Sequence, residues 1–153
     1  MARIGDVIEI PTVKGFAYAQ ITHRKPSYGP LLRVLEGTWQ EPPADPRGIV
    51  AEPARFHAFF PVDAAVRRGV VRRVGNVPVP DHARRFPLLR GGGIRNPDGS
   101  HGDWWLWDGD RETRIGQHLT AEQKALSTDD VVNDTLLIER IATDWHPGDE
   151  FWD

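Results

Sequence analysis

Three acidic residues have a spacing that could do chemistry. Asp108, Asp110 and Glu112 stand at alternate positions, and oxygen ligands at positions 1, 3 and 5 are what a calcium-binding loop needs. Such a loop also needs a glycine at its sixth position and a glutamate at its twelfth, where this chain has Thr113 and Leu119. The spacing therefore does not predict a calcium site.

The other candidate catalytic residues lack the spacing that their chemistry requires. The six histidines form no HExxH or HxxxH pair, and none of Ser27, Ser100 and Ser127 lies in a GxSxG motif. The glycines at 91–93 are not followed by the Lys and Ser/Thr of a phosphate-binding loop, so we interpret them as a flexible segment. With no cysteine, disulfides and thiolate metal sites are excluded. We predict a protein without catalysis, metal or cofactor.

The stretch DWWLWDGDRETRIG, residues 103–116, predicts a β-hairpin. Asp-Gly at 108–109 between alternating segments is a strong signal for a two-residue turn, which places Trp107 opposite Asp110 and Trp105 opposite Glu112. Because side chains alternate along a strand, one face of the hairpin is predicted to be core, and it carries Trp104, Leu106, Thr113 and Ile115.

The second face of this hairpin combines two tryptophans with charged groups, and a large aromatic anchor surrounded by polar groups is typical of a binding surface. We expect partner binding by five residues: Trp105, Trp107, Asp108, Asp110 and Glu112. Two alternatives remain open. The two tryptophans could pack under the 78–102 loop or the C-terminal helix, or they could form a ligand-binding or enzymatic pocket with His101 and the acidic residues.

The net charge of −3 conceals an uneven distribution along the chain. Residues 55–95 carry nine basic and two acidic side chains, whereas residues 96–153 carry four basic and fourteen acidic ones. The arginine-rich run at 67–75 could contact nucleic acid, but its valines indicate a sheet edge with solvated arginines. We expect the basic middle and the acidic end to neutralise each other in part, and we do not predict nucleic-acid binding.

The elements that must position these residues begin with an antiparallel sheet. Runs rich in β-formers, separated by turn residues, predict strands at 6–10, 16–22, 31–35, 55–62 and 69–74. The four prolines in 40–54 predict a surface excursion, and 78–102 is predicted to be a long ordered loop. Thr120 and Gln123 form a capping-box pattern for a short helix through Leu126, and Ser127 is predicted to cap a longer one over 128–145.

These elements predict one α+β domain over residues 1–153: a strongly curved antiparallel sheet, a partly open barrel-like meander, with the C-terminal helices packed on it. The docking face of the long helix is predicted to carry Val131, Ile138, Ile141, Ala142 and Trp145. No segment reaches the roughly 20 apolar residues of a membrane helix, and the N-terminus lacks a secretory-signal pattern. We therefore predict a soluble, cytoplasmic protein with no membrane partner.

Several short motifs resemble, in order, the immunity protein 26 family of bacterial polymorphic-toxin systems. They are GDVIEIPTVKGFAYAQI, RFHAFFPV, GVVRRVGNVPVP, WLWDG and LTAEQKAL, within residues 3–145. The resemblance implies a cytoplasmic protein that binds and inhibits a cognate toxin domain without catalysis. An acidic surface would suit a toxin with a basic site, as nucleases have, because complementary potential speeds encounter.

Overall fold

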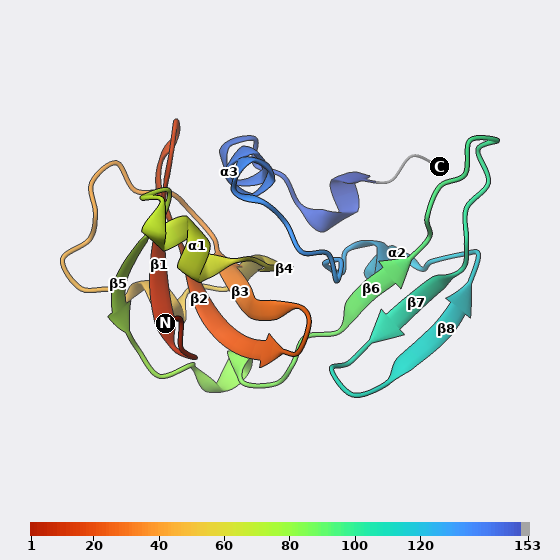
Figure 1. The fold of residues 1–153 in the computed structure, drawn as a ribbon, viewed down its shortest axis with the longest axis horizontal. Coiled ribbons are helices and arrows are strands. Elements are labelled where there is room, and N and C mark those ends of the chain that lie inside the picture. Colours follow the sequence, from red (N-terminus) through yellow and green to blue (C-terminus); the bar gives the residue numbers. More distant parts are fainter. Residues whose placement is uncertain (151–153) are drawn as a thin grey trace.

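The computed structural model describes residues 1–150, which form an α+β fold with two antiparallel sheets (Figure 1). The larger sheet has the strand order β4-β3-β2-β1-β5 and the smaller one β6-β7-β8. The strands are β1 (Asp6–Thr12), β2 (Gly15–Lys25), β3 (Gly29–Leu35), β4 (Ala54–Phe59), β5 (Arg72–Asn76), β6 (Leu89–Gly92), β7 (Trp104–Trp107) and β8 (Glu112–Gly116). The helices are α1 (Val62–Arg67), α2 (Ala121–Lys124) and α3 (Asp134–Ala142).

The first three strands form the predicted meander. Gly15 ends the turn between β1 and β2 with a φ of +125°, and a Cβ there would lie 2.7 Å from the carbonyl oxygen of Trp39. Only glycine meets both demands without strain. The hydroxyl of Thr12 donates to the Gly15 carbonyl across the turn at 2.8 Å, so the hairpin is fixed by its own sequence.

Both faces of the five-stranded sheet are covered. One face carries small and aliphatic side chains such as Ile8, Ala19 and Leu32, and α1 and α3 lie over it. The opposite face carries Tyr18 and Leu35 against Ile49 and Val50 of the proline-rich excursion, which holds the 3₁₀ turn Ile49–Ala51. Because that excursion covers the sheet, polar side chains beneath it on this face, such as Glu9 and Gln20, are buried.

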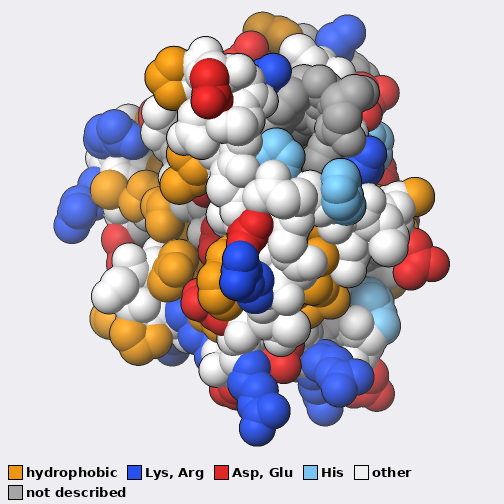
Figure 2. Space-filling view, turned by 90° about the vertical axis from the view of Figure 1, so that its right-hand side faces the viewer, with side chains coloured by type: hydrophobic (Ala, Val, Ile, Leu, Met, Phe, Trp, Pro, Cys, Tyr) orange, Lys and Arg blue, Asp and Glu red, His pale blue; other side chains and the backbone are white. Residues whose placement is uncertain are grey.

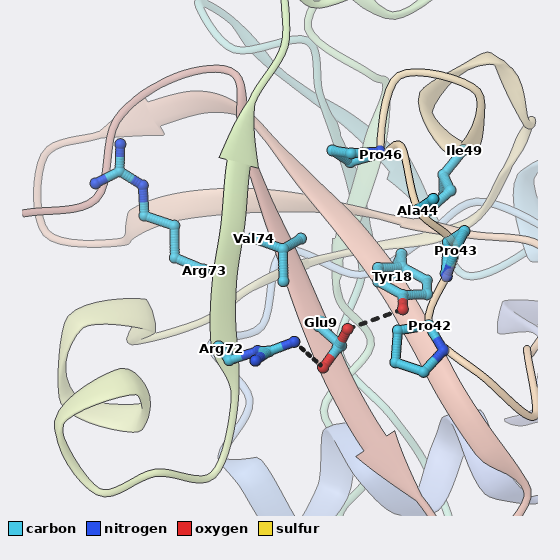
Figure 3. Close-up of a pocket in the computed structure, with 10 residues that line it drawn as sticks. All are labelled: Glu9, Tyr18, Pro42, Pro43, Ala44, Pro46, Ile49, Arg72, Arg73 and Val74. Carbon is cyan, nitrogen blue, oxygen red and sulfur yellow. Dashed lines mark hydrogen bonds and ion pairs between the residues drawn. The ribbon is translucent and has the colours of Figure 1, made fainter.

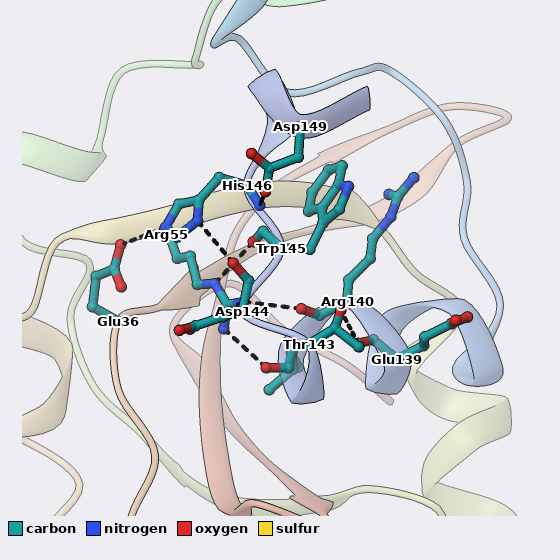
Figure 4. Close-up of polar contacts among 10 residues, drawn as sticks. Glu36, Arg55, Glu139, Arg140, Thr143, Asp144, Trp145, His146 and Asp149 are labelled. Carbon is teal, nitrogen blue, oxygen red and sulfur yellow. Dashed lines mark hydrogen bonds and ion pairs between the residues drawn. The ribbon is translucent and has the colours of Figure 1, made fainter. Parts of the chain in front are cut away.

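Helix α3 is held to the sheet by its apolar face and by one arginine. Leu137 and Ile141 are buried in the main core. Arg55 on β4, the edge strand, donates to the carbonyl oxygens of Arg140, Ile141 and Trp145 at 2.9–3.1 Å (Figure 4). These carbonyls lie at the C-terminal end of the helix, where a cation complements both the unpaired acceptors and the helix dipole.

The C-terminal third corrects part of the helix prediction. The capping box of Thr120 and Gln123 is present at α2, but Ser127 does not cap a helix; its hydroxyl accepts from the backbone N–H of His57 at 2.8 Å. Backbone bonds to Arg90 and Phe59 keep residues 127–132 extended between the two sheets. Asn133 caps α3 instead.

That shift changes which side chains dock. Val131 is 54% exposed and Val132 is buried, because the extended backbone alternates its side chains. Of the other predicted docking residues, Ile141 is buried and Ile138 and Trp145 pack against the main core, which also takes Leu137.

Two further elements lie where no such structure was predicted. The 78–102 segment contains β6, which is the inner edge of the small sheet, and α1 follows β4 where the strand prediction ran on to residue 62. Strand β6 was not predicted because it consists largely of Arg90 and glycines, and glycine is depleted in β-strands.

An aromatic cluster joins the two sheets. Leu31 and Phe59 of the large sheet pack with Leu89 of the small one, and the rings of Tyr28, Phe86 and Trp107 complete the contact. The sheets pack together but do not close into a barrel, so the α+β class is confirmed, whereas the partly open barrel-like form and the strong curvature stay predictions. No helix within residues 1–150 is both long and apolar enough to cross a membrane.

Candidate functional site

A cavity of about 380 Å³ opens between β1, β2, β5 and the proline-rich excursion (Figure 3). Its polar groups come from the sheet: Glu9 on β1, Tyr18 on β2 and Arg72 on β5. Its other walls are formed by the apolar residues Pro42, Pro43, Ala44, Pro46, Ile49 and Val74, together with Arg73 on β5. Polar groups brought together from different strands beside apolar walls are typical of a small-molecule site.

The three polar side chains form one connected group. The Tyr18 hydroxyl donates to Oε2 of Glu9 at 2.9 Å, and Nη2 of Arg72 lies 3.2 Å from Oε1. The Glu9 carboxylate is 5% exposed, whereas the Arg72 side chain is 68% exposed. Burial raises the pKa of Tyr18, and the hydrogen bond to the Glu9 carboxylate raises it further. Tyr18 is therefore a hydrogen-bond donor here and not a nucleophile.

Further buried polar side chains continue across the same sheet. Arg33 donates to the side-chain oxygen of Gln20 at 2.9 Å and to the carbonyl oxygens of Val50 and Glu52. His57, which pairs with Arg33 across β3 and β4, has its pKa lowered to about 4 by burial and by the charges of Arg33 and His23. Glu9, Tyr18, Gln20, Arg33 and His57 thus form a row of polar side chains across the sheet. Arg33 holds the excursion onto the sheet through its bonds to the backbone of Val50 and Glu52.

The arginines of β5 are paired with buried carboxylates. Arg73 lies on the other side of β5 from Arg72 (Figure 3), and its Nε is 3.1 Å from Oδ1 of the fully buried Asp6. The expected sheet edge is present, but Arg72 and Arg73 pair with the first strand and not with the acidic tail. The tail contributes elsewhere, through Arg68 with Asp134 and Arg55 with Asp144 at 3.4 and 3.6 Å.

The tryptophan hairpin forms with a different register from the predicted one. Trp107 pairs with Glu112 and Trp105 with Arg114, and the backbone N–H of Asp108 donates to the Arg111 carbonyl at 3.2 Å. The turn is displaced by one residue because the Asp108 carboxylate accepts the backbone N–H groups of Asp110 and Arg111 at 2.9 and 2.8 Å. Those bonds lower the pKa of Asp108.

This displacement leaves the same β8 side chains on the face of Trp105 and Trp107, because it moves the pairing by two residues and the side-chain period is two. Trp104 is buried at 6% exposure, as predicted, while Leu106 is half-buried. The prediction of one core face is therefore confirmed for Trp104, met only in part by the half-buried Leu106 and Ile115, and wrong for Thr113, which is exposed.

Trp107 is half-buried and packs in the aromatic cluster, so it does not form an open surface. Its ring lies 5.0 Å from Tyr28, 5.1 Å from Phe86 and 6.0 Å from Phe59, centroid to centroid. Gly109 is required for this packing, since a Cβ there would stand 2.8 Å from the Phe86 ring. Of the two tryptophans, Trp107 therefore packs against the 78–102 segment, through Phe86, as one of the alternatives predicted.

Trp105 is the exposed member of the pair, at 39%. Within residues 1–150, β8 is the outer strand of the small sheet, and Glu112 and Arg114 on it are exposed, as are Asp108 and Asp110 in the turn. Figure 2, which faces this end of the molecule, shows acidic and basic side chains side by side with hydrophobic ones between them. The predicted residues thus separate into an exposed group around Trp105 and the interior Trp107.

The predicted pocket of Trp105, Trp107 and His101 is not assembled. The His101 ring packs on Trp104 at 5.6 Å, and Trp104 alternates to the face opposite the other two tryptophans. The three glycines at 91–93, interpreted above as a flexible segment, lie close to neighbouring side chains, and Gly91 and Gly92 belong to β6. A Cβ on Gly91 would stand 2.5 Å from an oxygen of Asp129, and one on Gly93 would stand 2.3 Å from the Trp104 ring.

Sequence reasoning missed Glu9, Tyr18 and Arg72 as a group. They lie on three strands and are brought together only by pairing β1 with both β2 and β5. One signal was present: Gln20 and Arg33 stand within otherwise apolar strand segments, which indicates polar groups on a covered face.

Searches of protein-family models, curated proteins and solved structures found no match for this chain. Within residues 1–150, no three His, Asp or Glu side chains are grouped in a way that could hold a metal ion.

Proposed function

We propose that this chain is a cytoplasmic immunity protein, without catalysis of its own, that binds and neutralises a cognate toxin domain. The observation that carries the proposal is Trp105, a large aromatic side chain that is 39% exposed on the outer hairpin of the small sheet. The family resemblance of the short sequence motifs supports it independently.

The surroundings of Trp105 favour a binding role. Arg114 lies directly across the ladder, where its guanidinium pairs with Asp103. Glu112 lies on the same face and is exposed, so charged groups lie beside the ring. Residues of this type account for much of the binding energy at protein interfaces. The next tryptophan on that face, Trp107, packs in the aromatic cluster, so of the two rings Trp105 is the one available to a partner.

The charges near the hairpin favour a basic target, such as a nuclease toxin. Asp108, Asp110 and Glu112 are exposed on the hairpin. Glu112 also acts on Asp129, whose pKa is raised first by burial and then by the charges of Asp130 and Glu112. A basic partner would relieve that repulsion, and complementary charge would speed its association.

The test is binding to the toxin domain encoded by the neighbouring gene. We expect the pure proteins to form a complex, and Trp105→Ala to weaken it by about tenfold or more, as loss of a central anchor does. The matched control is Val66→Ala, which truncates a side chain of similar exposure, 38%, on α1. Isothermal titration calorimetry of the three forms measures the affinities, and thermal unfolding checks that each is folded.

Two outcomes would contradict the proposal. One is the absence of a complex with that toxin domain under conditions in which both proteins are folded. The other is an affinity that is the same for Trp105→Ala, Val66→Ala and the unaltered protein, which would remove the hairpin as the binding surface.

A further inference from the structure

The cavity over β1, β2 and β5 lies apart from the Trp105 surface, and its hydrogen-bonding groups are unevenly used. Glu9 has a donor on each oxygen, from Tyr18 at 2.9 Å and from Arg72 at 3.2 Å. The only hydrogen that the Tyr18 hydroxyl can donate is used in the bond to that carboxylate. The charge of Glu9 is thus matched within the protein, and the free capacity of the site lies with Arg72.

Arg72 is placed to bind an anion at the mouth of the cavity. A guanidinium has five N–H donors in a planar fork, and in Arg72 the side facing Glu9 makes an ion pair through Nη2 while 68% of the side chain remains exposed. Figure 3 shows the guanidinium turned to the same side of the strands as Glu9, Tyr18 and Pro42. The remaining N–H groups match the two oxygens of a ligand carboxylate.

The walls specify the rest of the ligand. The proline and aliphatic side chains that line the cavity opposite Arg72 offer an apolar surface with little side-chain entropy to lose on binding. The volume of about 380 Å³ lies at the small end of the range of ligand pockets, which is roughly 300–1,000 Å³. One ring-sized apolar group fits such a space.

We propose that this cavity binds a small apolar carboxylate, with its carboxylate on the outer N–H groups of Arg72 and its ring against Pro42, Pro43 and Val74. The pair of Glu9 and Tyr18 positions Arg72 by holding one side of its guanidinium. This site goes beyond the proposed toxin binding and does not depend on it.

The probe is benzoate, followed by methyl NMR. Ala44, Ile49 and Val74 line the cavity, so their methyl signals should move and saturate as benzoate is added. The methyl signals of Ile21 and Val62, which lie in the core on the opposite face of the sheet, should stay in place. Benzyl alcohol has the same ring without the charge, and we expect it to bind about tenfold more weakly or worse, since a charge-assisted pair is lost.

Two variants test the assignment by independent routes. Arg72→Gln removes the guanidinium and should weaken benzoate binding at least about tenfold. Val74→Phe fills the cavity, keeps the pair of Arg72 and Glu9, and should abolish the saturable shifts. Arg85→Gln, which removes an exposed arginine from the 78–88 loop, is the matched control and should bind benzoate as the unaltered protein does.

The proposal is overturned if the three reporter methyls show no saturable shift at benzoate concentrations up to about 20 mM, well above a millimolar dissociation constant. It is equally overturned if benzyl alcohol binds as well as benzoate, or if Val74→Phe leaves the binding intact. Should Arg72→Gln fail to fold, Val74→Phe and the comparison of the two probes still decide the question. Toxin affinity should be the same for Arg72→Gln and the unaltered protein, which separates this site from the Trp105 surface.

Discussion

The two sheets differ in where their charged side chains lie. In the five-stranded sheet, Asp6, Glu9 and Arg33 are buried, and each is bonded to groups on other strands or on the excursion that covers them. In the three-stranded sheet Arg90 on the inner strand β6 is buried in the same way, but the charged side chains of the outer strand β8 are exposed, and the contacts with the large sheet are mainly aromatic. A sheet covered on both faces must satisfy its polar groups internally, whereas a sheet with an open edge leaves them to water and to partners.

This comparison predicts that an aromatic truncation in the small sheet will be the most damaging change. Trp107→Ala should lower the free energy of unfolding by about 3–5 kcal/mol, as expected for loss of a large ring from a packed cluster. Trp105→Ala, the matched control on the same face, should cost about 1 kcal/mol or less because its ring is partly in water. Urea unfolding of both variants measures the difference. Equal losses would mean that the hairpin has no exposed side.

The buried polar row of the large sheet predicts a loss of stability in acid. The pKa of His57 is lowered to about 4 in the folded protein, against about 6.5 when unfolded. Between these values the unfolded chain binds more protons, so stability falls as the pH drops through that range, by roughly 3 kcal/mol for the full shift.

The measurement is urea unfolding of the unaltered protein and of His57→Gln at several pH values from 7.5 to about 4. The variant should show a clearly shallower dependence, because glutamine does not titrate. Parallel curves for the two proteins would show that His57 is not the group responsible and that the carboxylates account for the loss.

The smallest effect on stability is expected from removing a single hydroxyl, that of Tyr18, from the polar row of the large sheet. Tyr18→Phe keeps the ring against Trp39 but removes the donor to Glu9, and should lower the free energy of unfolding by about 1 kcal/mol. Tyr28→Phe is the matched control in the aromatic cluster, where the ring provides the contact, and it should cost less. If the control proves the more damaging, the contrast between a polar and an aromatic interior fails.

The parts of the fold that could be predicted are those set by neighbouring residues. The meander of β1, β2 and β3, the capping box at Thr120 and the surface excursion at 40–54 each follow from turn residues, a cap or prolines within a short window. The side chains that share each face of the hairpin were predicted correctly, but the position of the turn was not. The Asp108 carboxylate accepts two backbone N–H groups and displaces the turn by one residue.

The parts that could not be predicted depend on segments distant in the chain. Residues 127–132 were predicted to be helical, but they lie extended because backbone groups of Arg90 and Phe59 pair with them, and two sheet edges outweigh local propensity. Trp107 was assigned to the surface because its neighbours Tyr28 and Phe59 are distant in the sequence, and no local pattern indicates that they contact it.

The sequence by itself determined the α+β class, the alternation of the early strands and the pairing of faces in the tryptophan hairpin, because these depend on periods of two and on local turns. Only the tertiary structure decided which faces are covered. It packed the half-buried Trp107 into the aromatic cluster and left Trp105 exposed, and it brought Glu9, Tyr18 and Arg72 from three strands to one cavity. The physical reason is that burial is a property of the layer packed on a strand, and that layer comes from elsewhere in the chain.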